Sequence, residues 1–445
     1  MAMVVKNNIP AKNTLNQLDK NDKALAKSLK KVSSGMKINS AEDDASGYSI
    51  SEKMRVQVRG LDQDIDNAQT GKSMMKVAEG GVQSTVDILR TLKEKVINAA
   101  NDTNTDEDRA TIQKELDQAV DQLDENANVQ YNGKIMLDGS QNNGIPSPGT
   151  RTVLANDNIY AGTNGTDRIT SLRDFSGRSL GIASNSKIEF SYVIQGETYI
   201  TTLDPVGTNS IQNMFTRSVD SNGVRPPSTS ISMIFDSQSP ASATDRSGNR
   251  VETVHGNKAL MFVAGTPGIE GQISGLTINV INNDGTINRT ANSVLNNLNE
   301  ILQAENESPD NALVFQVGTK ANQSVKIGFS DMRAVALGLK AFDGGTLSIT
   351  TQKKANAAIS VLELAMEKAL KLQTTIGSVE SRMDFTVDNL TTSSENTQAT
   401  ESVIRDADMA REMTNYTKNN VLVQASQSML AQANQNSSSV LSLLQ

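Results

Sequence analysis

The sequence has no cysteine and no tryptophan, and its single histidine is His255. Without cysteine the chain can form no disulfide, thiolate metal site or cysteine nucleophile, and one imidazole excludes sites that need two, such as the H-E-x-x-H zinc motif. No pair of carboxylates stands out as a general acid and base. We therefore predict no catalytic residue, no metal site and no cofactor, and we expect His255 to lie in a loop or on the surface.

The chain also lacks concentrated positive charge and long apolar runs. Its formal net charge is -8 and its pI is near 5.0, which removes the electrostatic basis for binding nucleic acid. No apolar run approaches the roughly 20 residues that cross a bilayer, and the amino terminus lacks the apolar segment of a secretory signal. We expect no nucleic-acid partner, no membrane partner and no cleaved signal peptide, as in a cytoplasmic protein or one exported by another machine.

Proline is nearly absent from both ends of the chain. Of the nine prolines, only Pro10 lies outside the range 146–309, where Gly, Asn, Ser and Thr also concentrate. Because proline breaks helix interiors, both ends can be helical and the middle cannot. The predicted fold is α+β and multidomain, with long coiled-coil-like helical arms formed by the amino- and carboxyl-terminal regions and a β-rich central insert.

Heptad seams run through both predicted arms. The 4,3 spacing over Met54–Ala100 places apolar residues at eleven of fourteen positions, and the exceptions are Lys72, Glu79 and Lys93. A second seam runs over about 358–404 and becomes polar toward its end. Such seams predict long helices that pack on partners, either within one chain or between copies in a polymer.

Two capping-box patterns predict where helices begin. Ser40 is followed three residues later by Asp43, and Thr105 is followed in the same way by Asp108. We expect the second helix to fold back on the first. The predicted helices run over about 42–100 and 106–127.

The two ends of the chain are amphipathic segments with many polar positions in their seams. Their apolar residues are Leu15, Leu18, Leu25, Leu29 and Val32 at one end and Leu422, Met429, Val440 and Leu443 at the other. Helices of this kind are marginal alone. We see no obvious partner for them within one compact monomer.

In the middle of the chain the apolar pattern changes to a period of two, which is typical of strands. Residues 187–203 predict a hairpin that turns at Gln195 and Gly196, and we expect loops near Pro226, Pro227 and Pro240. The other predicted strands are 230–235, 259–265 and 275–281, with a further hairpin over 313–329.

Four sequence blocks, in this order, resemble the bacterial flagellin family. They are VSSGMKINSAEDDASGYSISEKM (Val32–Met54), VQYNGKIMLDG (Val129–Gly139), FQVGTKANQSVKIGFSDMRAVALGL (Phe315–Leu339) and IRDADMAREMTNYTKNNVLVQASQSMLAQANQ (Ile404–Gln435). The resemblance covers roughly 1–140 and 305–445. It implies a structural subunit that polymerises into the flagellar filament for swimming motility, by terminal helices that become ordered on docking.

The resemblance also implies a division into three parts. Residues 1–40 with 405–445 would form the filament core, 41–140 with 305–404 a helical rod with a β-hairpin, and 141–304 a variable β-rich outer part. The implied polymerisation interface consists of the terminal apolar residues named above together with Asp43, Asp44, Arg405, Asp406 and Asp408. For these charged residues, charge at helix starts is an equally simple explanation.

The implied partners are further copies of the chain in a helical homopolymer, an export chaperone on the carboxyl-terminal helix, and filament cap and hook-associated proteins. The implied location is the extracellular filament, reached through the flagellar export apparatus. Two alternatives stay open. One is a hook-filament junction protein, which shares such terminal helices, and the other is an adhesin-like module in which the β insert binds a surface.

One segment departs from the family. Flagellins that activate the Toll-like flagellin receptor carry a motif like LQRVRELAVQ, whereas this chain has LRTLKEKVIN (Leu89–Asn98). The Arg of that motif is replaced by Thr91 and a Leu by Lys95, while Glu115 still fits. We therefore predict only weak receptor activation through a surface formed by Leu89, Arg90, Thr91, Lys95 and Glu115.

Overall fold

The computed structural model describes residues 8–443 apart from 161–162, 164–165, 208, 212–230, 236–241, 245–249 and 253–259, with only the backbone of 231–235, 242–244, 250–252 and 437–443. His255 and the loops expected near Pro226, Pro227 and Pro240 lie outside the described residues. Two compact units divide the chain. The terminal unit is Met1–Ala68, Gln316–Gln323 and Phe385–Gln445, and the central unit is Gln69–Phe315 and Ser324–Asp384.

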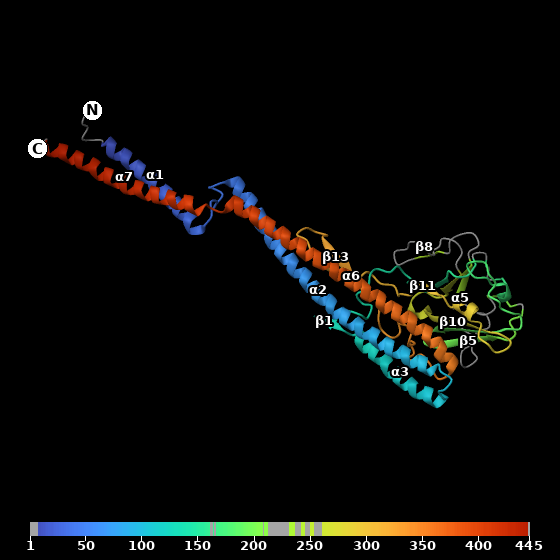
Figure 1. The fold of residues 1–445 in the computed structure, drawn as a ribbon. Helices are drawn as coiled ribbons and strands as arrows, with labels where there is room; N and C mark the ends of the chain where they lie inside the picture. The colour runs from blue at the N-terminus through green and yellow to red at the C-terminus, as the bar shows by residue number, and fades with distance from the viewer. Residues whose placement is uncertain are drawn as a thin grey trace. The chain divides into compact units, whose positions relative to one another are not determined.

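Five helices of more than twenty residues come from the two ends of the chain (Figure 1). The two longest, α2 and α6, have parts in both units. The helices are α1 (Ile9–Ser34), α2 (Ala45–Ala99), α3 (Asp106–Ala127), α6 (Gln352–Arg405) and α7 (Met409–Leu443). With the strands between them, they confirm the predicted α+β class. The three-part domain division stays a prediction.

One of the two predicted helix starts is right and the other is wrong. Thr105 and Asp108 form the reciprocal capping box at the start of α3. Ser40 does not cap α2, because the carboxylate of Asp44 accepts hydrogen bonds from the backbone N–H groups of Ser46 and Gly47 (3.1 and 3.0 Å). The helix therefore begins at Ala45, about three residues later than predicted.

The heptad seam of α2 packs in the central unit as the spacing predicts. The seam residues Met75, Val82, Val86, Leu89 and Val96 are buried. At two positions where the seam carries lysine, the ammonium reaches a carboxylate of α6: Lys72 pairs with Asp384 and Lys93 with Glu363 (2.9 Å). The two lysines of the seam are thus paired across the helices of this unit.

The predicted hairpin over 187–203 is confirmed as β4 (Lys187–Ile194) and β5 (Glu197–Leu203). Gln195 and Gly196 both have positive φ, which is the geometry of a two-residue hairpin turn. The strand β10 (Ile273–Ile281) pairs with the other edge of β4, so the sheet order is β10-β4-β5.

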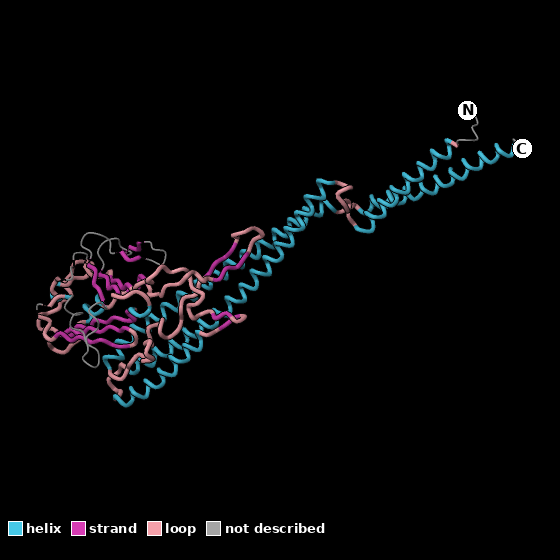
Figure 2. Tube along the Cα trace, turned by 180° about the vertical axis from the view of Figure 1, so that it is seen from behind, coloured by secondary structure: helices cyan, strands magenta, loops and turns pink. Residues whose placement is uncertain are grey.

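A second sheet has the order β11-β3-β9-β6, and its strands come from distant parts of the insert. They are β11 (Asn299–Leu302), β3 (Val153–Asn156), β9 (Leu260–Ala264) and β6 (Ile231–Phe235). Three two-stranded ladders complete the described strands (Figure 2): β1 (Gln130–Tyr131) with β2 (Lys134–Ile135), β12 (Leu313–Gln316) with β13 (Ser324–Ile327), and β7 (Ser242–Thr244) with β8 (Arg250–Glu252).

The insert shares its core with α6. Leu364 of α6 packs against a cluster of buried residues from the sheets, among them Phe190, Tyr192 and Phe262. A methyl group on Gly275 of β10 would lie 2.9 Å from the backbone nitrogen of Val361, so only glycine allows this approach. Among the described helices, none has an apolar stretch sufficient to span a membrane.

Candidate assembly surface of the terminal unit

The helices α1 and α7 pair in an antiparallel manner (Figure 1). Polar side chains lie between them. The amide of Asn21 donates to the hydroxyl of Ser426 (2.8 Å), and the amide of Asn419 donates to the hydroxyl of Ser28 (3.1 Å). Asn21, Ser28 and Ser426 are buried, together with Val423. The contact between the two helices therefore gains little from apolar burial.

Four large apolar residues of the pair are exposed on its outer surface. Met429 is 63% exposed, Leu29 is 51%, Leu15 is 46% and Leu422 is 40%. Isolated apolar residues on a surface are ordinary, but here they are the seam residues of two amphipathic helices. The inner seam of this pair thus mixes Leu18, Leu25, Val32 and Val423 with Asn21, Ser28 and Ser426, and the four exposed apolar residues lie along its outer flanks.

The remaining predicted interface residues of the two helices are less exposed. Leu18, Leu25 and Val32 are half-buried. The side chains of Val440 and Leu443 lie outside the part of the chain whose side chains are described. Their role in an interface stays a prediction.

The loop after α1 meets the break between α6 and α7. Gly35 ends α1 with φ of 70°, and its carbonyl accepts from the backbone N–H of Ala407 (2.9 Å). The N–H of Lys37 donates to the carbonyl of Arg405 (2.7 Å), and Met36 and Asp406 form a single antiparallel bridge. These backbone bonds hold the loop between α1 and α2 against the junction between α6 and α7 in the terminal unit.

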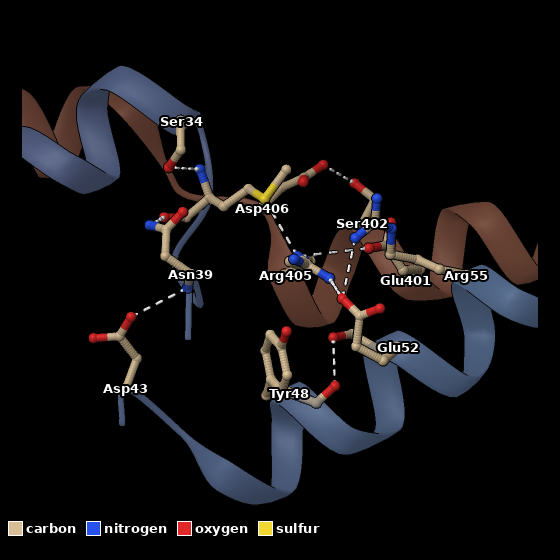
Figure 3. A network of polar contacts seen from close by, with 12 residues as sticks. Ser34, Asn39, Asp43, Tyr48, Glu52, Arg55, Glu401, Ser402, Arg405 and Asp406 are labelled. Atoms are coloured by element: carbon tan, nitrogen blue, oxygen red, sulfur yellow. Dashed lines mark hydrogen bonds and ion pairs between the residues drawn. The ribbon is translucent and has the colours of Figure 1, made fainter. Parts of the chain in front are cut away.

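Arg405 lies at the centre of this junction (Figure 3). Its side chain is 7% exposed and binds the carboxylate of Glu52 at 2.6 Å. Its Nε donates to the sulfur of Met36 (3.2 Å), and its guanidinium lies 5.6 Å from the ring centre of Tyr48. The hydrogen bond from Arg405 lowers the pKa of Glu52, and Arg55 lowers it further. The guanidinium is therefore held by groups of its own chain.

The acidic residues of the predicted interface also have partners within the chain. Asp43 pairs with Lys27 (2.9 Å), which lowers its pKa from 3.8 to about 2. Asp408 accepts from the backbone N–H of Arg411 at the start of α7 (3.1 Å), as Asp44 does at the start of α2. Asp406 accepts from the hydroxyl of Ser402. Asp44 and Asp408 thus act as helix caps, the simpler of the two explanations.

In the central unit, the predicted receptor-type surface is wrong for Leu89. Leu89 is fully buried, because it lies on the seam face of α2. Arg90 pairs with Asp87 (3.1 Å), and the hydroxyl of Thr91 donates to the carbonyl of Asp87 (3.0 Å). Lys95 pairs with Glu115 of α3 at 2.7 Å.

Sequence reasoning missed the polar residues that hold the terminal unit together. The heptad spacing places Ser426 in the seam as a polar position, but it predicts no role for Asn21, Asn419, Glu52 or Tyr48. Their signal in the sequence is the occurrence of Asn and Ser at helical spacing. That pattern does not say which residues face each other.

Two family models match the ends of the chain. Residues 5–142 match the bacterial flagellin N-terminal helical region, and residues 359–444 match the bacterial flagellin C-terminal helical region. A flagellin of Clostridium tyrobutyricum is 31% identical, over 97% of this chain and 99% of its own, and a flagellin of Bacillus subtilis is 27% identical, over 99% and 100%. A Legionella pneumophila flagellar junction protein of known structure is 13% identical, with a TM-score of 0.32, over 80% of this chain and 100% of its own. The chain therefore belongs to the bacterial flagellin family, whose members are structural subunits of the extracellular flagellar filament and not enzymes.

Proposed function

We propose that this subunit polymerises by docking the outer apolar face of the α1–α7 pair onto the same pair in neighbouring subunits. The observation that carries the proposal is the arrangement of that pair, with Asn and Ser inside and Leu15, Leu29, Leu422 and Met429 outside. Burying such side chains stabilises an assembly by about 1.5–3 kcal/mol each. Contacts between different surfaces of successive copies extend into a helical filament if they do not close.

We also propose that the pair becomes fully ordered only on assembly. The contact between α1 and α7 buries few apolar side chains, and net hydrogen bonds of the Asn21–Ser426 type contribute only about 1 kcal/mol each. Such a pair offsets the entropy of helix formation poorly without neighbouring subunits. Folding of the ends and growth of the filament would thus be one event.

The experiment is a pair of substitutions on the outer face of α7. In Leu422→Ser with Met429→Ser, we expect the critical concentration for elongation of filament seeds to rise at least tenfold, because two apolar contacts are lost. The matched control is Gln424→Ser with Gln427→Ser, which changes exposed positions of the same helix without removing apolar surface. Elongation by Leu422→Ser with Met429→Ser at the normal critical concentration would reject the proposal.

The remaining proposed partners are those that membership of the flagellin family implies. We propose that an export chaperone binds the apolar face of α7 before export through the flagellar apparatus, and that filament cap and hook-associated proteins contact the same terminal pair in the filament. Covering the outer apolar residues before assembly would prevent premature polymerisation. A chaperone complex that leaves Leu422 and Met429 as accessible to chemical footprinting as in the free chain would contradict this.

We propose that activation of a Toll-like receptor is weak. Thr91 stands where active flagellins carry Arg, and Lys95 holds Glu115 in an ion pair of 2.7 Å. In reporter cells, Thr91→Arg with Lys95→Leu should signal at lower doses than the parent chain, while Thr91→Ser should not. Potent signalling by the unchanged protein at picomolar to nanomolar doses would contradict the proposal.

A further inference from the structure

Two aromatic side chains of the central unit are exposed on neighbouring loops. Aromatic residues make up only 3% of the chain, and several of them, such as Phe190 and Phe262, fill the core of the insert. Phe175 is nevertheless 70% exposed and Tyr160 is 46% exposed. Phe342 and Phe385 are exposed too, so exposure alone does not indicate a binding surface, and Tyr160 and Phe175 are distinguished by lying on adjacent segments.

A short antiparallel ladder places both rings on one face. Ile159 lies opposite Asp174, the N–H of Tyr160 donates to the carbonyl of Arg173 (3.0 Å), and the N–H of Phe175 donates to the carbonyl of Asn158 (2.8 Å). Side chains alternate between the two faces of such a ladder, and Ile159 is buried in the core. The opposite face, which we call the ring face, carries Asn158, Tyr160, Arg173 and Phe175.

The turn that carries Phe175 is held rigidly. The carboxylate of Asp174 accepts from the hydroxyl of Ser176 (2.7 Å), from the backbone N–H of Arg178 (2.9 Å) and from its Nε (3.2 Å). The Ser176 hydroxyl and then Arg178 lower the pKa of Asp174. Gly177, with φ of 83°, closes the turn. Because the turn is ordered before binding, little conformational entropy is lost when a ligand docks.

We infer that the ring face binds an acidic polysaccharide, with uronate-type sugars as the ligand class. The C–H face of a pyranose stacks on the electron-rich face of an aromatic ring, and two neighbouring rings accommodate consecutive sugars. A guanidinium binds a carboxylate through paired N–H groups, and Arg173 is exposed with one long hydrogen bond, to the Gly177 carbonyl (3.4 Å). Arg178 is exposed as well, but Asp174 balances its charge (3.2 Å), so Arg173 is the cation of this face that meets the sugar carboxylate.

This inference does not depend on how the subunits dock. If the chain is displayed along a filament, many ring faces contact one polysaccharide chain, and weak single contacts add up through avidity. The test can therefore use the full-length monomer for intrinsic affinity. Its failure would leave the proposed assembly surface untouched, because no residue of the α1–α7 pair takes part.

The test is retardation of the full-length protein in gels that contain polygalacturonate. We expect retardation that falls with salt, is at least tenfold weaker on fully methyl-esterified pectin, and is absent on polyglutamate, which has the charge without the sugar. Phe175→Ala, Tyr160→Ala and Arg173→Gln should each weaken binding about tenfold, whereas Phe175→Trp should retain it. The matched control is Phe342→Ala, which removes another ring of the central unit that is 56% exposed.

Three results would overturn the inference. They are no retardation of the parent protein, equal retardation on polyglutamate, which would indicate simple charge attraction, and equal loss in Phe342→Ala, which would indicate a general effect of surface rings. Thermal melting by circular dichroism checks that each variant is folded. Loss of binding in Phe175→Ala with retention in Phe175→Trp cannot be explained by unfolding.

Discussion

At the residue scale, the terminal unit is held together by a small number of paired polar side chains. Asp43 illustrates this, because its carboxylate joins two segments, accepting from the backbone N–H of Asn39 (3.1 Å) and from the ammonium of Lys27 in α1 (2.9 Å). Both bonds need the ionised carboxylate. The start of α2 is therefore tied to α1 by a group that titrates in acid.

The pairing of Asp43 predicts acid sensitivity. Its pKa falls from 3.8 to about 2, mainly through the hydrogen bond from Lys27, so its stabilising effect is complete above the unfolded pKa and is lost as pH falls from about 4 toward 2. We expect the melting temperature of the parent chain to decrease over that window. The melting temperature of Asp43→Asn should be lower than that of the parent chain at neutral pH, and it should decrease less steeply as the pH falls.

Circular dichroism melts between about pH 5 and about pH 2 measure both quantities. Glu42→Gln is the matched control, since it removes the exposed neighbouring carboxylate, which forms no ion pair within the described part of the chain. If Asp43→Asn and the parent chain lose stability with the same pH slope, the Asp43–Lys27 bond is not responsible for the acid transition.

At the element scale, the long helices contain a polar residue whose burial is not compensated. Asp64 of α2 is 5% exposed, its Oδ2 has no hydrogen-bond partner among the described residues, and burial raises its pKa. A raised carboxyl pKa costs stability above the unfolded value and costs nothing below it. This position is therefore suboptimal for folding at neutral pH.

Asp64→Asn should consequently raise the melting temperature by a few degrees at pH 7. The gain should shrink as pH falls toward 3, because the parent side chain is then protonated and neutral too. Asp62→Asn is the matched control in the same turn of α2, where the carboxylate accepts from Ser394 (2.9 Å) and its removal should destabilise or have no effect. A neutral-pH melting temperature that is unchanged or lower in Asp64→Asn would contradict the interpretation.

The sheet edge at β10 is covered by side chains of the short helix α5 (Arg289–Leu295) and the residue that follows it. Asn296 accepts from the N–H of Ile278 (2.7 Å) and donates to its carbonyl (2.8 Å), as a neighbouring strand would. Asn292 accepts from the N–H of Val280 (2.7 Å). These amides complete the ladder and block pairing with another chain.

Asn296→Ala should destabilise the central unit by about 1–2 kcal/mol, because two hydrogen bonds to the backbone of a buried residue are lost. It should also promote aggregation on heating, because part of a sheet edge becomes available. Chemical denaturation and light scattering measure these effects. In Asn282→Ala, which loses only a bond to the Thr286 hydroxyl, we expect neither. Equal behaviour of the two variants would contradict the role of Asn296.

Local signals in the sequence were sufficient for part of this fold. The capping box of Thr105 and Asp108 is complete within four residues, and the turn at Gln195 and Gly196 needs only the two residues that tolerate positive φ, so both were predicted. The start of α2 was not, because Ser40 and Asp43 match the same pattern, whereas Asp44 caps the helix. Asp43 instead pairs with Lys27, a residue of another helix that the local pattern does not contain.

Long-range contacts explain what the sequence did not reveal. The strands β3 and β11 have four residues each, too few for a clear period, and each is stabilised by partners elsewhere in the insert. For the candidate site, periodicity identified Leu422 and Met429 as members of an apolar face. It could not say that Ser426, between them on the helix surface, packs on Asn21, because the spacing does not identify the partner residue.

At the scale of the whole molecule, the insert begins and ends at adjacent points of the central unit. The N–H of Ile145 donates to the carbonyl of Ser308 (3.0 Å), and the N–H of Ser308 donates to the carbonyl of Ile145 (3.2 Å). Such a reciprocal pair is the one that flanks a two-residue hairpin loop. The chain between them can therefore be replaced by Asn-Gly without moving the helical arms.

Removing residues 146–307 separates the filament role from the adhesin alternative. The insert covers Val361 and Leu364 of α6, so the shortened chain also needs Val361→Thr and Leu364→Gln to avoid an exposed apolar patch. We expect it to elongate filament seeds, seen by electron microscopy, because α1 and α7 are unchanged, and to lose binding to polygalacturonate, because the ring face is gone. The same chain with Leu422→Ser and Met429→Ser should not elongate. If the shortened chain retains its helical circular dichroism but forms no filaments, residues of the insert are needed for assembly, and the terminal pair alone does not direct it.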